Sequence, residues 1–269
     1  MQRRCFHKIW AALAVVVVAL LPLQDAFARH QATIVLQNGR QAQGEVRYLP
    51  ASRSYELRVN GTIREVSLSD VAEIRLAQPP SGLNEALRNV ERGRYQQAIS
   101  TLRTVVEDYA MFGPDREAGK ALIRAYLRTD RSSDALSTAE SLIRRDSRIE
   151  DDPAFATVYW EALLEEERLS TLRGAIGDAI QSGSRDLAAV GLLRRGDLEM
   201  REENYREALV NGYLRVVLLF RDVGLVQPEA LYKAIQAHEE LNEVSHAERW
   251  RQRLLSSHAT SEYAERLRD

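Results

Sequence analysis

Alanines recur at a regular interval along the last two thirds of the chain. The steps from Ala98 to Ala135, from Ala135 to Ala208 and from Ala208 to Ala247 are 37, 73 and 39 residues, and 73 is two periods. The missing unit would place Thr171 at the equivalent position. A small residue allows two helices to approach closely, so this interval predicts a helix–turn–helix unit that repeats and stacks into a solenoid.

The clearest unit is the stretch Gly196–Leu219. It predicts the end of one helix, a tight turn at Glu202–Asn204 and a second helix that starts near Tyr205. The aromatic ring of Tyr205 would fill the wedge beside the turn, and Ala208 would face the partner helix. This arrangement predicts an antiparallel helix pair.

The pattern resembles the tetratricopeptide repeat (TPR) over residues 83–255. The matching small and aromatic positions are Gly93, Tyr95, Ala98, Tyr126, Ala135, Gly196, Tyr205, Ala208 and Ala247. The chain departs from the family in its longer period, in the absence of the usual early tryptophan and in the third unit, which lacks the alanine. The resemblance implies a mainly α solenoid of about five helix pairs whose concave groove binds a peptide or protein.

Residues 1–28 predict a signal peptide. Arg3, Arg4 and Lys8 precede an apolar run, and Ala26-Phe27-Ala28 supplies the small residues that a signal peptidase requires. The alternative is an uncleaved membrane anchor, but the apolar run is shorter than a helix needs to span a bilayer. Cleavage after Ala28 would remove the single cysteine, Cys5. We therefore expect a periplasmic or secreted protein without disulfides, thiol chemistry or a stable transmembrane span.

Residues 29–78 alternate between apolar and polar side chains. Asn38-Gly39 and Asn60-Gly61 separate such runs and predict hairpins, and Val71–Leu76 predicts a last strand. Five short strands resemble a small Sm-like or SH3-like β-barrel, which would bind a ligand or cap the first repeat. Residues 79–82, with two prolines, predict a linker to the solenoid at 83–269.

From Leu83 onward the apolar residues recur at helical spacing. Helix pairs are expected at 83–106, 115–145, 153–181, 186–221 and after Pro228. Gly174 and Gly177 weaken the second helix of the third pair unless they permit close packing. A last short helix, Ser261–Leu267, would be a cap that faces solvent.

The sequence signals for catalytic chemistry are weak. The formal net charge of −2 gives no reason to expect nucleic acid as a partner. His238 lies beside two glutamates, which on a surface helix predicts a solvated segment better than a metal ligand set, and no histidine pair has helical metal-site spacing. We expect no enzyme activity, no cofactor and no metal.

The concave groove of a TPR-like solenoid is built by the first helix of each pair. Counting from the matched alanines by the family's spacing, the groove positions are Lys120, Arg124, Arg128, Trp160, Asp197, Arg201, Tyr232 and Gln236. For Trp160, a position in the packed core is an equally good prediction. Lys120, Arg124 and Arg128 lie one turn apart and form a basic stripe that suits an acidic peptide.

The sequence thus predicts a non-catalytic adaptor or scaffold of the cell envelope that binds a protein or peptide partner in the groove. The alternative is a cell-wall or polysaccharide-binding module in which the small barrel is the binding unit and the repeats are a spacer.

Overall fold

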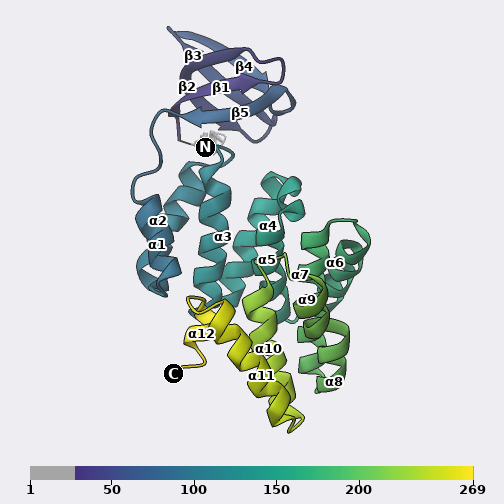
Figure 1. The fold of residues 1–269 in the computed structure, drawn as a ribbon. Coiled ribbons are helices and arrows are strands. Elements are labelled where there is room, and N and C mark those ends of the chain that lie inside the picture. Colours follow the sequence, from purple (N-terminus) through teal and green to yellow (C-terminus); the bar gives the residue numbers. More distant parts are fainter. Residues whose placement is uncertain (1–27, 269) are drawn as a thin grey trace, which may run out of the picture.

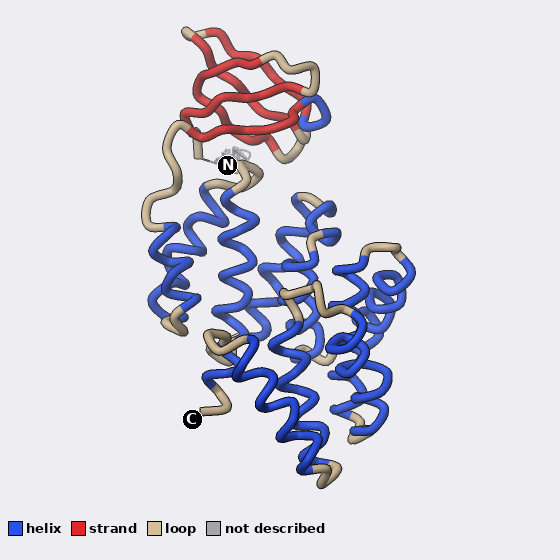
Figure 2. Tube along the Cα trace, in the orientation of Figure 1, coloured by secondary structure: helices blue, strands red, loops and turns tan. Residues whose placement is uncertain are grey.

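The computed structural model describes residues 28–268 and contains a small sheet at one end of an array of helices (Figures 1 and 2). The strands are β1 (His30–Leu36), β2 (Gln41–Leu49), β3 (Ser54–Val59), β4 (Thr62–Ser67) and β5 (Val71–Leu76), and a 3-10 turn (Leu68–Asp70) precedes β5. The predicted signal peptide lies outside the described residues except for Ala28. In the described part of the chain, no helix combines the length and apolarity that crossing a bilayer requires.

Both predicted Asn-Gly turns join neighbouring antiparallel strands, but they differ in geometry. Asn60 and Gly61 both have positive φ (47° and 79°), as a two-residue type I′ turn requires. At the first turn only Gly39 has positive φ, and its N–H donates to the Leu36 carbonyl. This is the three-residue turn in which glycine takes the left-handed position.

The sheet is open, so the predicted barrel is wrong. The strand order is β4-β3-β2-β1-β5, which leaves β4 and β5 as unpaired edges. A barrel would bury one face of β4, whereas five of its six residues are exposed. The apolar face of the sheet is covered instead by Phe112, which lies between two helices and shares a core with Ile34, Val46 and Tyr55.

Several contacts around Phe112 join the sheet to the helices. Tyr55 Oη donates to the Met111 carbonyl at 2.5 Å, and His30 Nε2 lies 2.8 Å from the Asp108 carbonyl. The His30 ring stacks on Tyr109, with 4.1 Å between the ring centroids. These contacts fix the sheet on the first helix pairs, as a packing module would be fixed.

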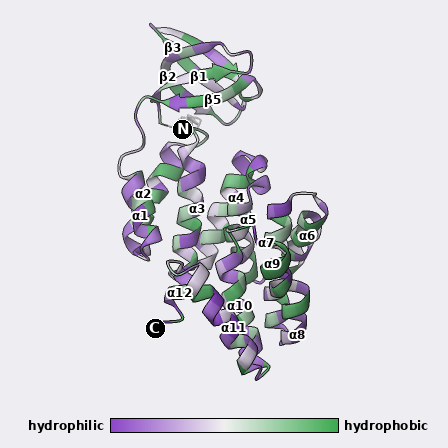
Figure 3. Ribbon diagram, viewed as in Figure 1, coloured by the Kyte–Doolittle hydropathy of each residue, from purple (hydrophilic) through white to green (hydrophobic). Residues whose placement is uncertain are grey.

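The helices follow the predicted pairs closely. They are α1 (Leu83–Glu91), α2 (Tyr95–Asp108), α3 (Pro114–Leu127), α4 (Ser132–Arg145), α5 (Pro153–Glu165), α6 (Leu169–Gln181), α7 (Arg185–Arg201), α8 (Tyr205–Glu207), a π-helical segment (Ala208–Tyr213), α9 (Leu214–Leu219), α10 (Gln227–Glu240), α11 (Val244–Ser257) and α12 (Glu262–Glu265); a 3-10 segment (Ser147–Asp151) precedes α5. Most helices carry both hydrophobic and hydrophilic residues (Figure 3), as expected for helices with one buried face.

The five helix pairs share one turn. In each, the backbone N–H that follows the turn donates to the carbonyl five residues earlier, as in Arg94 to Asn89, Arg131 to Tyr126, Arg168 to Leu163, Asn204 to Glu199 and Glu243 to His238. The residue directly before each donor has a left-handed backbone. These residues are at positions 93, 130, 167, 203 and 242, which are 37, 37, 36 and 39 residues apart. This is the Schellman arrangement that ends a helix.

The shared turn fixes the register of the third unit. Ala98, Ala135 and Ala208 are fully buried, and Ala247 is 3% exposed. In the third unit the buried residue at this position is Leu172, whereas Thr171 is exposed, so the register predicted for this unit is wrong by one residue. Gly174 and Gly177 have no atom within 4 Å of an added Cβ, so they do not mark a close helix packing.

Two other glycines mark a close helix approach. A Cβ on Gly212 would lie 2.5 Å from the Cα of Gly196, and one on Gly196 would lie 2.5 Å from the Tyr213 ring. Gly212 belongs to the π-helical segment, whose wider turn lies against α7. Gly196 is therefore the matched small residue that the packing requires most strictly.

Candidate functional site

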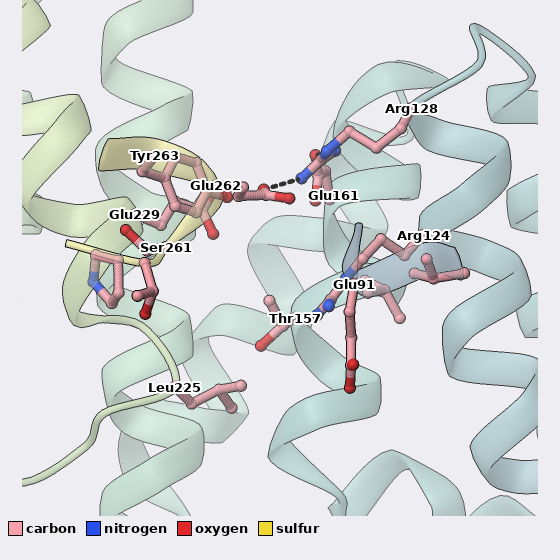
Figure 4. A pocket seen from close by; sticks show the side chains of 14 residues that line it. Glu91, Arg124, Arg128, Thr157, Glu161, Leu225, Glu229, Ser261, Glu262 and Tyr263 are labelled. Atoms are coloured by element: carbon pink, nitrogen blue, oxygen red, sulfur yellow. Dashed lines mark hydrogen bonds and ion pairs between the residues drawn. The ribbon is translucent and has the colours of Figure 1, made fainter. Parts of the chain in front are cut away.

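The first helices of the first four pairs lie side by side and form one face of the helical array. α1 contacts α3, α3 contacts α5 and α5 contacts α7, while α10 packs on the fourth pair. A pocket of about 320 Å³ opens on this face between α1, α3, α5, the start of α10 and the segment that carries α12 (Figure 4). We take this pocket and its walls as the groove.

Two arginines of α3 and its C-terminal cap line the groove. Arg128 Nη1 donates to Glu161 of α5 at 2.6 Å, and its side chain is only 14% exposed. Arg124, one turn earlier, is half-buried, and its side chain forms no hydrogen bond or ion pair within 4 Å in the described range 28–268, although its charge acts on Glu262. Arg124 is thus a cation that is available to an acidic guest.

A buried charge network lies behind the groove. Arg194 of α7 is fully buried and donates from Nη1 to Asp197 and to Glu229, both at 2.6 Å. Its Nη2 donates to the Thr157 carbonyl at 3.1 Å. Lys233 adds a second cation, with Nζ at 2.7 Å from Asp197. The network therefore joins α5 and α10, which line the groove, to α7 behind them.

The network holds Glu229 in the charged form. Burial by itself would raise the pKa of Glu229, but the charges of Arg194 and Lys233 outweigh burial and lower it. The pKa of Glu262 is lowered in the same way, because Arg128 outweighs the effect of burial. Carboxylates that stay ionised suit charge recognition rather than general acid chemistry.

The segment with α12 occupies part of the groove, so the predicted solvent-facing cap is wrong. Glu262 accepts a hydrogen bond from Arg128 at 3.1 Å, and Tyr95 of α2 donates to Glu262 at 3.4 Å. The Tyr263 ring lies against Tyr232 of α10, with 5.6 Å between centroids, and Ala264 is fully buried. The apolar residues of this segment turn inward, where Arg128 neutralises the single acid that accompanies them.

The structure brings only some of the predicted groove residues together. Arg124 and Arg128 line the pocket, and Tyr232 contacts the α12 segment that forms its wall. Lys120 ion-pairs with Asp152 at the start of α5, at 2.6 Å, so the third cation of the basic stripe is already neutralised.

The remaining predicted groove residues lie elsewhere. Trp160 is 6% exposed and packs in the core beside a different depression, because its side of α5 faces α6. Asp197 is buried in the charge network. Arg201 donates to the Leu164 carbonyl and to Glu167 at a neighbouring turn, and Gln236 is exposed outside the pocket.

Sequence reasoning did not find Arg194, Glu229 or Tyr263. Arg194 continues the apolar face of α7 that Leu187, Val190 and Gly191 begin, and a charge on a buried face needs a partner. That signal is visible in the sequence. The partner Glu229 is 35 residues away and could be identified only from the fold.

The chain was also compared with protein-family models, with curated proteins and with solved structures, and none of them matches it.

Proposed function

We propose that the chain is a non-catalytic adaptor of the bacterial cell envelope, exported by its signal peptide, whose groove binds a partner segment with an acidic residue followed by an aromatic one. One observation carries the proposal. The groove already holds such a segment from its own chain, with Glu262 on Arg128 and Tyr263 on Tyr232. A partner segment of the same chemistry would compete for these contacts.

The resemblance of residues 83–255 to tetratricopeptide repeats supports the same function, since grooves of that family bind peptides. The five shared turns and the contacts between first helices agree with such a stack. The alternative, with the sheet as a polysaccharide-binding unit, has less support. The apolar face of the sheet is covered by Phe112 and is thus committed to the helices.

A labelled peptide with the sequence of residues 258–268 tests the proposal. The chain with Glu262→Arg and Tyr263→Ala loses the internal contacts, so its groove is open to the peptide. We expect this variant to bind the peptide at least about tenfold more tightly than the wild type, because the fraction of free groove limits the apparent affinity. Absence of binding to the open variant, with its helical circular dichroism intact, would contradict the proposed function.

A further inference from the structure

A second cluster of chemically active side chains lies at the turn between α10 and α11. His238 is in the last turn of α10, Glu243 caps α11 and His246 follows in its first turn. The donor atoms of the three side chains all lie within 4.8 Å of one another. The sequence gives no helical spacing for such a set, because the turn brings together residues that are eight positions apart.

The turn itself does not explain the two histidines. In other pairs a glutamate at this turn also accepts a bond from the preceding pair, as in Ser132 to Glu166 and Arg173 to Glu202. Arg206 makes a similar bond to Glu243 at 3.0 Å, although Glu243 follows the left-handed residue of its turn and the other two glutamates precede theirs. The residues equivalent to His238 at the other turns are Asn89, Tyr126, Leu163 and Glu199. The histidines are therefore an addition to a common turn.

The orientation of the ligand atoms suits a metal ion. Arg206 binds Oε1 of Glu243, which leaves Oε2 turned toward His238 Nδ1 at 2.8 Å. Nε2 of His238 is buried without a partner among the described residues, whereas Nδ1, which now shares a hydrogen bond with Glu243, is the nitrogen that faces the carboxylate. An outer partner that fixes a ligating carboxylate, as Arg206 does, is a usual part of metal sites.

We propose that His238, Glu243 and His246 bind one divalent transition-metal ion of the zinc class. Two imidazoles and one carboxylate are a known three-ligand zinc set that leaves a fourth position for water. Zinc–ligand distances of about 2.0–2.2 Å require the bonded pair, now at 2.8 Å, to separate by roughly half an ångström. His246 is exposed, and its ring, 5.2 Å from that of His238, can turn toward the ion.

The site is separate from the groove. His238 is nine residues beyond Glu229 on α10, which is about 14 Å along a helix. A bound ion would link α10 to α11 and, through Arg206, to the fourth helix pair. Its effect would be on the stability of the last two pairs, whatever the groove binds.

Zinc titration of the full chain without a polyhistidine tag tests the site. We expect one Zn²⁺ per chain. His246→Ala should lower the zinc affinity by more than about tenfold, because even the loss of an outer partner of a metal ligand has an effect of that size. His258→Ala should leave the zinc affinity unchanged. His246 is exposed and its substitution leaves the fold intact, whereas His238→Ala removes a buried ring.

The melting temperature gives a second readout. Zinc should raise it in the wild type and in His258→Ala but not in His246→Ala, because an ion that binds only the folded chain stabilises it. Absence of zinc binding in the wild type, or equal affinity and stoichiometry in His246→Ala, would overturn the proposal. Equal affinity would mean an adventitious ion only.

Discussion

At the level of single residues, the shared turns contain backbone strain that a substitution by glycine could relieve. Four of the five left-handed positions carry a residue with a Cβ, namely Asp130, Glu167, Glu203 and Asn242. The left-handed conformation costs such a residue about 1–2 kcal/mol, and only the first turn uses glycine. Repetition of the turn therefore does not depend on glycine.

Glu203→Gly should stabilise the chain by about 1 kcal/mol, because it removes the left-handed strain at φ 59°. Glu203 is exposed, and no hydrogen bond or ion pair of its side chain occurs in the described range. Thermal unfolding measures the change, and Arg249→Gly in the exposed interior of α11 is the control, with an expected loss of about 1 kcal/mol. Destabilisation by both substitutions would contradict the turn assignment.

Gly196→Ala should destabilise the chain by about 1–3 kcal/mol, because its Cβ would lie 2.5 Å from the Tyr213 ring. Gly174→Ala, in a helix with free space around it, should stabilise by about 1 kcal/mol. Denaturant unfolding of the two variants compares them directly. The helix crossing described here would be incorrect if the two shifts had the same sign.

At the scale of elements, charge pairs rather than apolar contacts alone align α5, α7 and α10. Arg194 can stay buried because Asp197 and Glu229 accept its hydrogen bonds and Thr157 supplies a carbonyl. Removing one member of such a set leaves an uncompensated charge in the interior. The groove thus depends on a network that lies beneath it.

Glu229→Gln should cost about 3–5 kcal/mol at neutral pH, because it removes one partner of the buried Arg194. Glu248→Gln, on an exposed side chain, should change stability by less than about 0.5 kcal/mol. Chemical unfolding at pH 7 checks both values. A cost for Glu229→Gln as small as that of the control would contradict the structural role of the network.

The same network predicts acid sensitivity. The pKa of Glu229 in the folded chain lies below its unfolded value of about 4.3. The contribution of ionised Glu229 to the free energy of unfolding is therefore present above that pH and is lost as the pH falls through the folded pKa. The wild type should therefore lose stability below about pH 4 more steeply than Glu229→Gln. Parallel melting curves for the two chains from pH 5 to pH 2 would contradict this prediction.

At the scale of the whole molecule, the sequence predicted local structure better than long-range placement. The strand Val71–Leu76 has the predicted bounds, and α4 ends at Arg145, where the predicted second helix pair ends, because hairpin turns and apolar period are local signals. Closure of the sheet, the course of α12 and the partner of Arg194 depend on residues distant in sequence, such as Phe112 and Glu229. Of the predicted groove, only Arg124 and Arg128 line the pocket.

The proposed groove would recognise an acidic segment through α3. Arg124 is the better residue to test this, because its side chain has no hydrogen bond or close ion pair in the described part of the chain and acts on Glu262 only through its charge, whereas Arg128→Glu would also break the contact with Glu161. In the chain that already carries Glu262→Arg and Tyr263→Ala, the further change Arg124→Glu should alter the melting temperature little, because the Arg124 side chain has no hydrogen bond or close ion pair in the described range to lose.

The decisive measurement is the affinity of the labelled 258–268 peptide for the open chain, which carries Glu262→Arg and Tyr263→Ala, with and without Arg124→Glu, at low and high salt. We expect weaker binding with Arg124→Glu at low salt and a smaller difference at high salt, because salt screens attraction between exposed charges. Equal affinity of the two folded proteins at low salt would contradict this expectation.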